Sequence, residues 1–152
     1  MIRKILVFIF LFIVVANFYA QDRGFGAGII LGEPTGLSAK YWFSENNAFD
    51  FGLGYSLVKD HGEFSFHFDY LYHLDEILHT NILLPVYYGF GFRYRAEEHS
   101  ESSFGVRGVV GIAWLSNELP IDIFAEVAPV FKLLPETNLA FDAGIGIRYF
   151  FY

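Results

Sequence analysis

Three side chains that could form a nucleophilic relay stand at alternate positions of one segment: Ser65, His67 and Asp69. Alternate residues of a β-strand share one face, and they stand about 6.6 Å apart with parallel side chains. A Ser–His–Asp relay instead needs each side chain to hydrogen-bond to the next. The spacing therefore favours a polar strand face over a triad, and we expect no catalytic residue.

The five histidines could suggest a metal site: His61, His67, His73, His79 and His99. His67 and His73 share a strand face but would lie about 20 Å apart. His61 and His99 stand among acidic residues. We expect solvated acidic loops there, with a weak surface metal site as the minor alternative.

Two other chemistries have little support. Glycine gathers at 24–28 and 144–146, but no helix follows either stretch, so neither is a phosphate-binding loop. The chain has no cysteine, which excludes disulfides, Cys-ligated zinc, thiol catalysis and a lipoprotein anchor. We expect no cofactor.

The composition is unusual for a domain of 152 residues: 54% of the residues are hydrophobic and 20% are aromatic. A chain this apolar is not disordered. Its formal net charge is −7. Nucleic-acid binding needs a basic face, so we expect no nucleic-acid partner.

Residues 1–20 have the layout of a secretory signal peptide. A basic start with Arg3 and Lys4 is followed by an apolar run over 5–15 and by small residues up to Ala20. Eleven apolar residues are too few to span a bilayer as a helix. We expect cleavage after Ala20, or after Ala16, since Phe18 departs from the small-residue rule. An uncleaved anchor is the alternative. Residues 21–152 then form one domain.

No later apolar run reaches 18 residues, which excludes membrane-spanning helices after residue 20. Instead, apolar residues alternate with small or polar ones, which is the period of a β-strand. Eight segments show this pattern: 24–32, 36–43, 48–57, 64–73, 83–95, 104–114, 121–131 and 139–151. Several are longer than a typical globular strand of about five or six residues.

Charges within these segments share the face opposite the large apolar residues. They are five basic residues, Lys40, Arg93, Arg95, Arg107 and Arg148, and five acidic ones, Asp50, Asp69, Asp122, Glu126 and Asp142, joined by His67. An eight-stranded barrel has an interior only just wide enough for side chains, so the bulky face does not fit inside. Because the other face is rich in glycine and balanced in sign, we expect it to line the lumen, with the apolar face toward lipid. Backbone groups in lipid must all be paired, which requires a closed barrel.

Aromatic residues gather toward both ends of the predicted strands, as in the girdles of membrane barrels. The predicted girdle comprises Tyr41, Phe43, Tyr70, Tyr72, Tyr94, Trp114 and Tyr149. Pro129 lies on the predicted lipid face and lacks a ladder donor, so we expect a bulge or kink there.

The chain resembles the small eight-stranded outer-membrane barrels of the OmpA transmembrane-domain and OmpX type, including an uncharacterised family of them. The stretches that carry the resemblance are FGAGIILGEPTGLSAKYWF, FGLGY, YYGFGFRYR and AGIGIRYFF. The last resembles a barrel-assembly signal through Ile147, Tyr149 and Phe151, with Tyr152 one residue beyond the pattern. The resemblance implies an all-β, antiparallel up-and-down transmembrane barrel in a bacterial outer membrane, lipid as a partner, and insertion by the barrel-assembly machinery. It implies no catalytic residue.

The function predicted is that of an integral structural or surface-interaction protein, not an enzyme, with the lumen plugged by its charges. Outer loops at 33–35, 58–63, 96–103 and 132–138 are expected opposite periplasmic turns at 44–47, 74–81 and 115–120. Cations or basic surface partners could bind the acidic loop residues Glu33, Asp60, Glu63, Glu97, Glu98, Glu101 and Glu136. Two alternatives stay open: a periplasmic lipocalin-like carrier of an apolar ligand, and a lipid-modifying barrel enzyme using His61 and His99.

Overall fold

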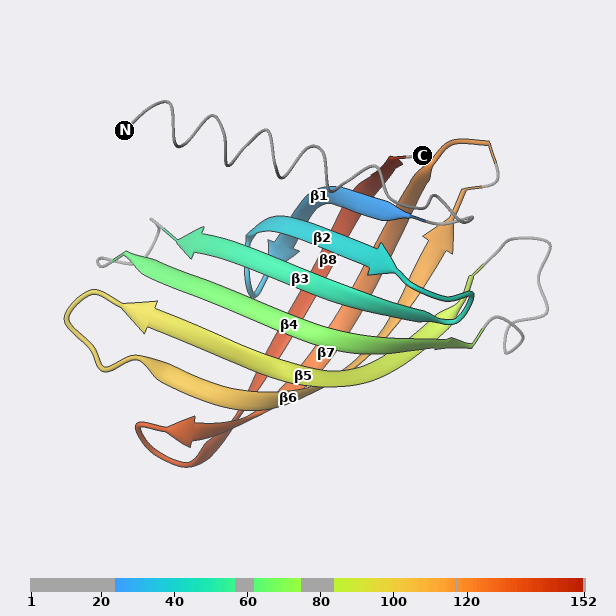
Figure 1. The fold of residues 1–152 in the computed structure, drawn as a ribbon. Helices are drawn as coiled ribbons and strands as arrows, with labels where there is room; N and C mark the ends of the chain where they lie inside the picture. The colour runs from blue at the N-terminus through green and yellow to red at the C-terminus, as the bar shows by residue number, and fades with distance from the viewer. Residues whose placement is uncertain (1–23, 57–61, 75–83, 117, 152) are drawn as a thin grey trace, which may run out of the picture.

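The computed structural model describes residues 24–56, 62–74, 84–116 and 118–151. The expected signal peptide lies outside them, as do His61 and His79. Within the described residues, eight antiparallel strands follow one another in chain order and close into a barrel (Figure 1). The strands are β1 (Phe25–Gly32), β2 (Gly36–Trp42), β3 (Asn47–Ser56), β4 (Glu63–Leu74), β5 (Val86–Glu97), β6 (Ser103–Leu115), β7 (Ile121–Leu134) and β8 (Asn138–Phe151).

The predicted fold class is confirmed, and each strand end lies within three residues of its predicted position. The last strand closes the barrel by pairing with the first, from Phe25 opposite Phe151 to Gly32 opposite Gly144. In Figure 1, β7 and β8 pass behind β2–β4 and complete the far wall. No helix in the stretches that the structure describes is long and apolar enough to cross a membrane.

The barrel wall carries large apolar side chains on its outer face and charged ones on its inner face, which is the inverse of the usual arrangement in water-soluble domains. Large apolar side chains on the outer face are exposed, and Phe90 and Phe141 reach 70% and 71%. The alternating positions point inward, where Lys40, Arg107 and Asp122 are buried. The phase predicted from the alternation is therefore the phase of the folded strands.

Glycine permits close strand approach on the inner face of the narrow barrel. A Cβ atom on Gly28 would collide with the backbone carbonyl of Ile147 on β8. That carbonyl cannot move without disturbing the β1–β8 ladder that closes the barrel. Glycine at position 28 therefore lets the first and last strands meet.

Two local predictions need correction. The β6–β7 register is unchanged across Pro129, since Arg107 pairs with Val130 and Val110 with Val127. The irregularity instead lies between Phe104 and Gly105, near the end of β7. No bulge therefore lies at Pro129, and the alternative of a local kink there stays a prediction. The second correction concerns Glu63, which begins β4 rather than lying in a loop.

Candidate functional site

The candidate site is the polar lumen, which has two distinguishable ends. We call the end where β1 begins and β8 finishes the terminal end. The opposite end carries the β1–β2, β3–β4, β5–β6 and β7–β8 connections, and we call it the hairpin end. Eight inward strand faces converge on this lumen, so residues far apart in the sequence become neighbours.

In the terminal half, Arg148 lies between two carboxylates. One Nη atom is 2.6 Å from Asp50 Oδ2, and Nε is 3.0 Å from Asp122 Oδ1. The guanidinium also lies 3.9 Å from the ring centroid of Phe124, a cation–π distance. All four side chains are buried. One arginine therefore ties β8 to β3 and β7 across the barrel.

In the middle of the lumen, Arg107 contacts three acidic side chains. Its nitrogen atoms lie 3.1 Å from Asp69, 3.2 Å from Glu126 and 3.5 Å from Asp142. These partners come from β4, β7 and β8. A buried charge is tolerated when it is paired in this way.

Toward the hairpin end, two arginines of β5 complete the network. Arg93 bonds to Asp142. Arg95 lies 3.1 Å from Glu63 and 2.7 Å from Glu33, which belongs to the β1–β2 connection. Glu63 is buried, whereas the Glu33 side chain is 47% exposed. The network therefore reaches solvent at this end.

The sequence pattern does not identify Glu63 as a lumen residue, because the predicted segment begins at Phe64. The β4–β5 pairing places it opposite Glu97, with its side chain on the inward face. Glu63 is separated by an even number of residues from Ser65, His67 and Asp69, so it lies on the same strand face. This spacing is the signal that could have identified it.

An apolar floor closes the terminal end. Trp42, Ala48 and Phe150 form a buried cluster there. The His73 ring lies 4.2 Å from the ring of Trp42, and Lys40 Nζ lies 2.8 Å from His73 Nε2. We call Trp42, Ala48, Phe150 and His73 the floor.

Tyr87 links the floor to the charges above it, and sequence reasoning missed this residue. Its ring lies 5.2 Å from His73, and its hydroxyl donates to Glu126 Oε2 at 2.9 Å. Lys40 Nζ lies 4.9 Å from the same ring centroid. Tyr87 lies in an apolar run, but it is separated by an even number of residues from Arg93 and Arg95. Residues at even spacing share one strand face, and this pattern could have placed Tyr87 inside the barrel.

The structure brings Ser65, His67 and Asp69 onto one inward face without making a relay. His67 Nε2 is 3.9 Å from Asp69 Oδ2, and neither Ser65 Oγ nor His67 Nδ1 has a hydrogen-bond partner. All three side chains are buried. Nothing in this geometry activates the serine as a nucleophile. Within the described ranges, no group of three or more His, Asp or Glu side chains could hold a metal ion.

The predicted girdle residues lie on the outer wall, half-buried or exposed: Tyr41, Phe43, Tyr70, Tyr72, Tyr94, Trp114 and Tyr149. The hydroxyl of Tyr70 donates to Asn47, and that of Tyr94 to Ser102. Ile147 and Phe151 are exposed on the same wall. Their part in assembly stays a prediction.

Comparisons with known proteins extend to the fold alone. No family model matches the chain, and no curated protein matches it. Among solved structures, it is similar to the N-terminal β-barrel domain of Pseudomonas aeruginosa OprF, with a TM-score of 0.56 and 16% identity. The match covers 84% of this chain and 95% of that one. At this identity, the likeness shows a shared β-barrel fold.

Proposed function

We propose that this protein is an integral β-barrel of the bacterial outer membrane, with a structural or surface-interaction role. The observation that carries the proposal is the inverted polarity of the barrel wall. Large apolar side chains are exposed around the outside, while the strand charges are buried inside. Such a wall suits hydrocarbon, and a closed barrel pairs the backbone groups of every strand.

The lumen is proposed to be a plug rather than a conduit. Each of the four arginines in it contacts at least one carboxylate. Three of these contacts join strands that are not neighbours, as from Arg148 on β8 to Asp50 on β3. Eight strands leave little room beyond their own side chains. Fixed ion pairs and the apolar floor together obstruct passage.

The surface-interaction role rests on the acidic hairpin end. Glu33, Glu97, Glu98, Glu101 and Glu136 are exposed there. Like charges gathered at one end attract cations and basic partners in a salt-dependent way. Residues 1–20 are proposed to direct export, and the strand ending at Phe151 is proposed to be recognised by the barrel-assembly machinery.

The two alternatives fit the geometry less well. A lipocalin-like carrier needs an apolar cavity, but this interior is filled with paired charges around Arg107 and Arg148. A lipid-modifying enzyme needs a nucleophile or base at the rim. Of the two histidines expected for this role, His61 lies outside the described residues and His99 is exposed at the hairpin end. Ser65 and His67, the nearest serine–histidine pair on one strand, lie buried in the lumen rather than at the rim.

Membrane fractionation of the expressed full-length chain tests the proposal. We expect a protein that resists alkaline extraction, dissolves in detergent, and changes gel mobility on boiling, because a closed barrel stays folded in detergent. A water-soluble protein without a heat-dependent shift would refute it. For the surface role, replacing the exposed glutamates at 97, 98 and 101 with glutamine should weaken binding of a basic peptide. Unchanged binding would remove the support for that role.

A further inference from the structure

One part of the outer wall departs from the continuous layer of bulky side chains. Ala27 on β1 pairs directly with Ala39 on β2, and both point outward. On the outer sides of this pair, Tyr149 of β8 pairs with Ala27, and Phe51 of β3 pairs with Ala39. This is the one place in the described ladders where two outward alanines are paired across adjacent strands. The small side chains leave a depression between larger neighbours.

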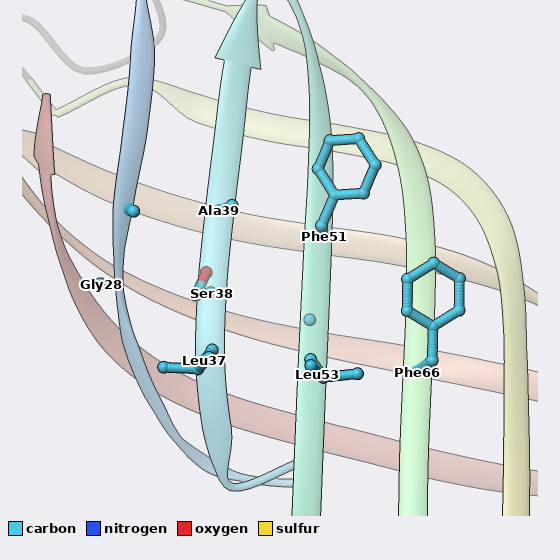
Figure 2. Close-up of a pocket in the computed structure, with 9 residues that line it drawn as sticks. Gly28, Leu37, Ser38, Ala39, Phe51, Leu53 and Phe66 are labelled. Carbon is cyan, nitrogen blue, oxygen red and sulfur yellow. The ribbon is translucent and has the colours of Figure 1, made fainter. Parts of the chain in front are cut away.

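Toward the hairpin end a second depression adjoins the first, and the two share Leu37 and Leu53 in their linings. The first section, of about 340 Å³, is lined by Ala27, Leu37, Ala39, Phe51, Leu53 and Phe66 along with the backbone beside them (Figure 2). A second section, of about 430 Å³, shares Leu37 and Leu53 and reaches Thr35, Tyr55 and Phe64. We call the two sections together the furrow. Its outward lining is hydrocarbon until the hydroxyl groups of Thr35 and Tyr55 at the rim.

The length of the furrow matches one leaflet of a bilayer. From Ala39 to Thr35 the chain advances four residues, or about 14 Å along the strand. At a strand tilt of about 40°, this spans roughly 11 Å along the barrel axis, close to half of an apolar band about 25 Å tall. The furrow thus begins at the rim and ends near mid-depth.

The furrow is narrow, which limits what can occupy it. The bottom of the furrow near Ala27 and Ala39 consists of two adjacent strands, whose axes lie about 4.8 Å apart. An α-helix with side chains is about 10–12 Å wide, so a helix cannot enter. A second barrel presents a broad convex wall and cannot fill a depression that is two residues wide between Tyr149 and Phe51. A single hydrocarbon chain has the required width and chemistry.

We propose that the furrow holds one acyl chain of a membrane lipid from the leaflet at the hairpin end, with the lipid's polar end near Thr35 and Tyr55. This inference rests on the proposed membrane location. The furrow is continuous with the exposed apolar wall around it. Moving an acyl chain from surrounding lipid onto an apolar protein surface gives no net hydrophobic free energy, since both environments are apolar. Close van der Waals packing against the small residues therefore supplies the preference of the chain for the furrow.

The test uses the full chain in vesicles of phosphatidylethanolamine and phosphatidylglycerol. A trace of phosphatidylethanolamine carries a photoactivatable diazirine in the terminal half of one acyl chain, and labelled peptides are mapped by mass spectrometry. Only protein that resists alkaline extraction and keeps its heat-dependent gel shift is irradiated. Failure at that stage refutes the membrane location, whereas the labelling pattern tests the furrow.

We expect several-fold more label around Ala27 and Ala39 than on the β7–β8 wall. Ala39→Phe fills the depression and should reduce this label to the level of that wall. The matched control is Ala125→Phe, because Ala125 is also outward but pairs with Ile112 and Ile145. It should leave the furrow label unchanged. Even labelling around the barrel, an Ala39→Phe variant with undiminished label, or an unlabelled furrow in a cross-linked dimer would each overturn the proposal.

Discussion

Replacing Arg148 with methionine tests whether the lumen charges form an interdependent network. Methionine keeps an unbranched side chain against Phe124 but removes the partner of Asp50 and Asp122. Both carboxylates are buried. The variant therefore leaves two acidic groups facing each other in a lumen where little water reaches them.

The expected loss is about 3–5 kcal/mol of unfolding free energy, which is typical when one partner of a buried ion pair is removed. Lys40 pairs across the strands with Asp50 and offsets part of the repulsion, so we expect the lower end of that range. Combining Arg148→Met with Asp122→Asn removes one basic and one acidic group and leaves Lys40 paired across the strands with Asp50. This double variant should recover most of the loss, because buried charges are tolerated when they are compensated.

The assay is a urea titration of the barrel refolded in detergent, with the folded fraction read from gel mobility without boiling. Arg95→Met serves as the comparison: it also removes a partner of buried Glu63, but Arg95 and its second partner Glu33 are in contact with solvent, so its loss should be smaller. The reasoning fails if Arg148→Met costs less than about 1 kcal/mol, the range of surface pairs. It also fails if the double variant is no more stable than Arg148→Met alone.

Three further substitutions probe other parts of the barrel. Tyr87→Phe removes the hydroxyl that donates to Glu126 and should cost about 1–3 kcal/mol in the same titration, since a buried acceptor loses its donor; an unchanged midpoint would argue against this bond. Gly28→Ala should abolish the heat-dependent gel shift, because its Cβ collides with backbone, whereas Gly108→Ala meets only ordinary van der Waals contacts and should retain the shift; equal behaviour would contradict the close-approach argument. Trp42→Ala opens the floor and should raise single-channel conductance in planar bilayers above that of the unmodified barrel, and unchanged conductance would show that the ion pairs alone seal the lumen.

Strand number, strand phase and the inward charges could be predicted because each depends on a period of two along the chain. Parity is a local property, so it requires no knowledge of neighbouring strands. Gly52 on β3 illustrates the same rule, since it faces the lumen beside the ring of His67. Parity also determined which face would carry the large apolar residues.

The pairing of particular charges could not be predicted in this way. Asp50 and Arg148 are 98 residues apart, and their contact depends on how the strand registers add up around the closed barrel. A register slip of one residue reverses every side chain of a strand, so parity restricts the registers without fixing them. The position of the β6–β7 irregularity near Phe104 likewise depends on the fit between neighbouring strands.

The charge balance of the lumen follows from its unequal access to water. In the terminal half, two basic residues, Lys40 and Arg148, face two acidic ones, Asp50 and Asp122. From the middle of the lumen to the hairpin end the acidic residues outnumber the basic ones, because Glu63 joins Asp69, Glu126 and Asp142 against Arg93, Arg95 and Arg107. An uncompensated charge is costly where no solvent reaches it, so neutrality is required only near the floor. The surplus acid lies beside Arg95 and Glu33, where solvent is present, and it gives the hairpin end the sign that would attract cations.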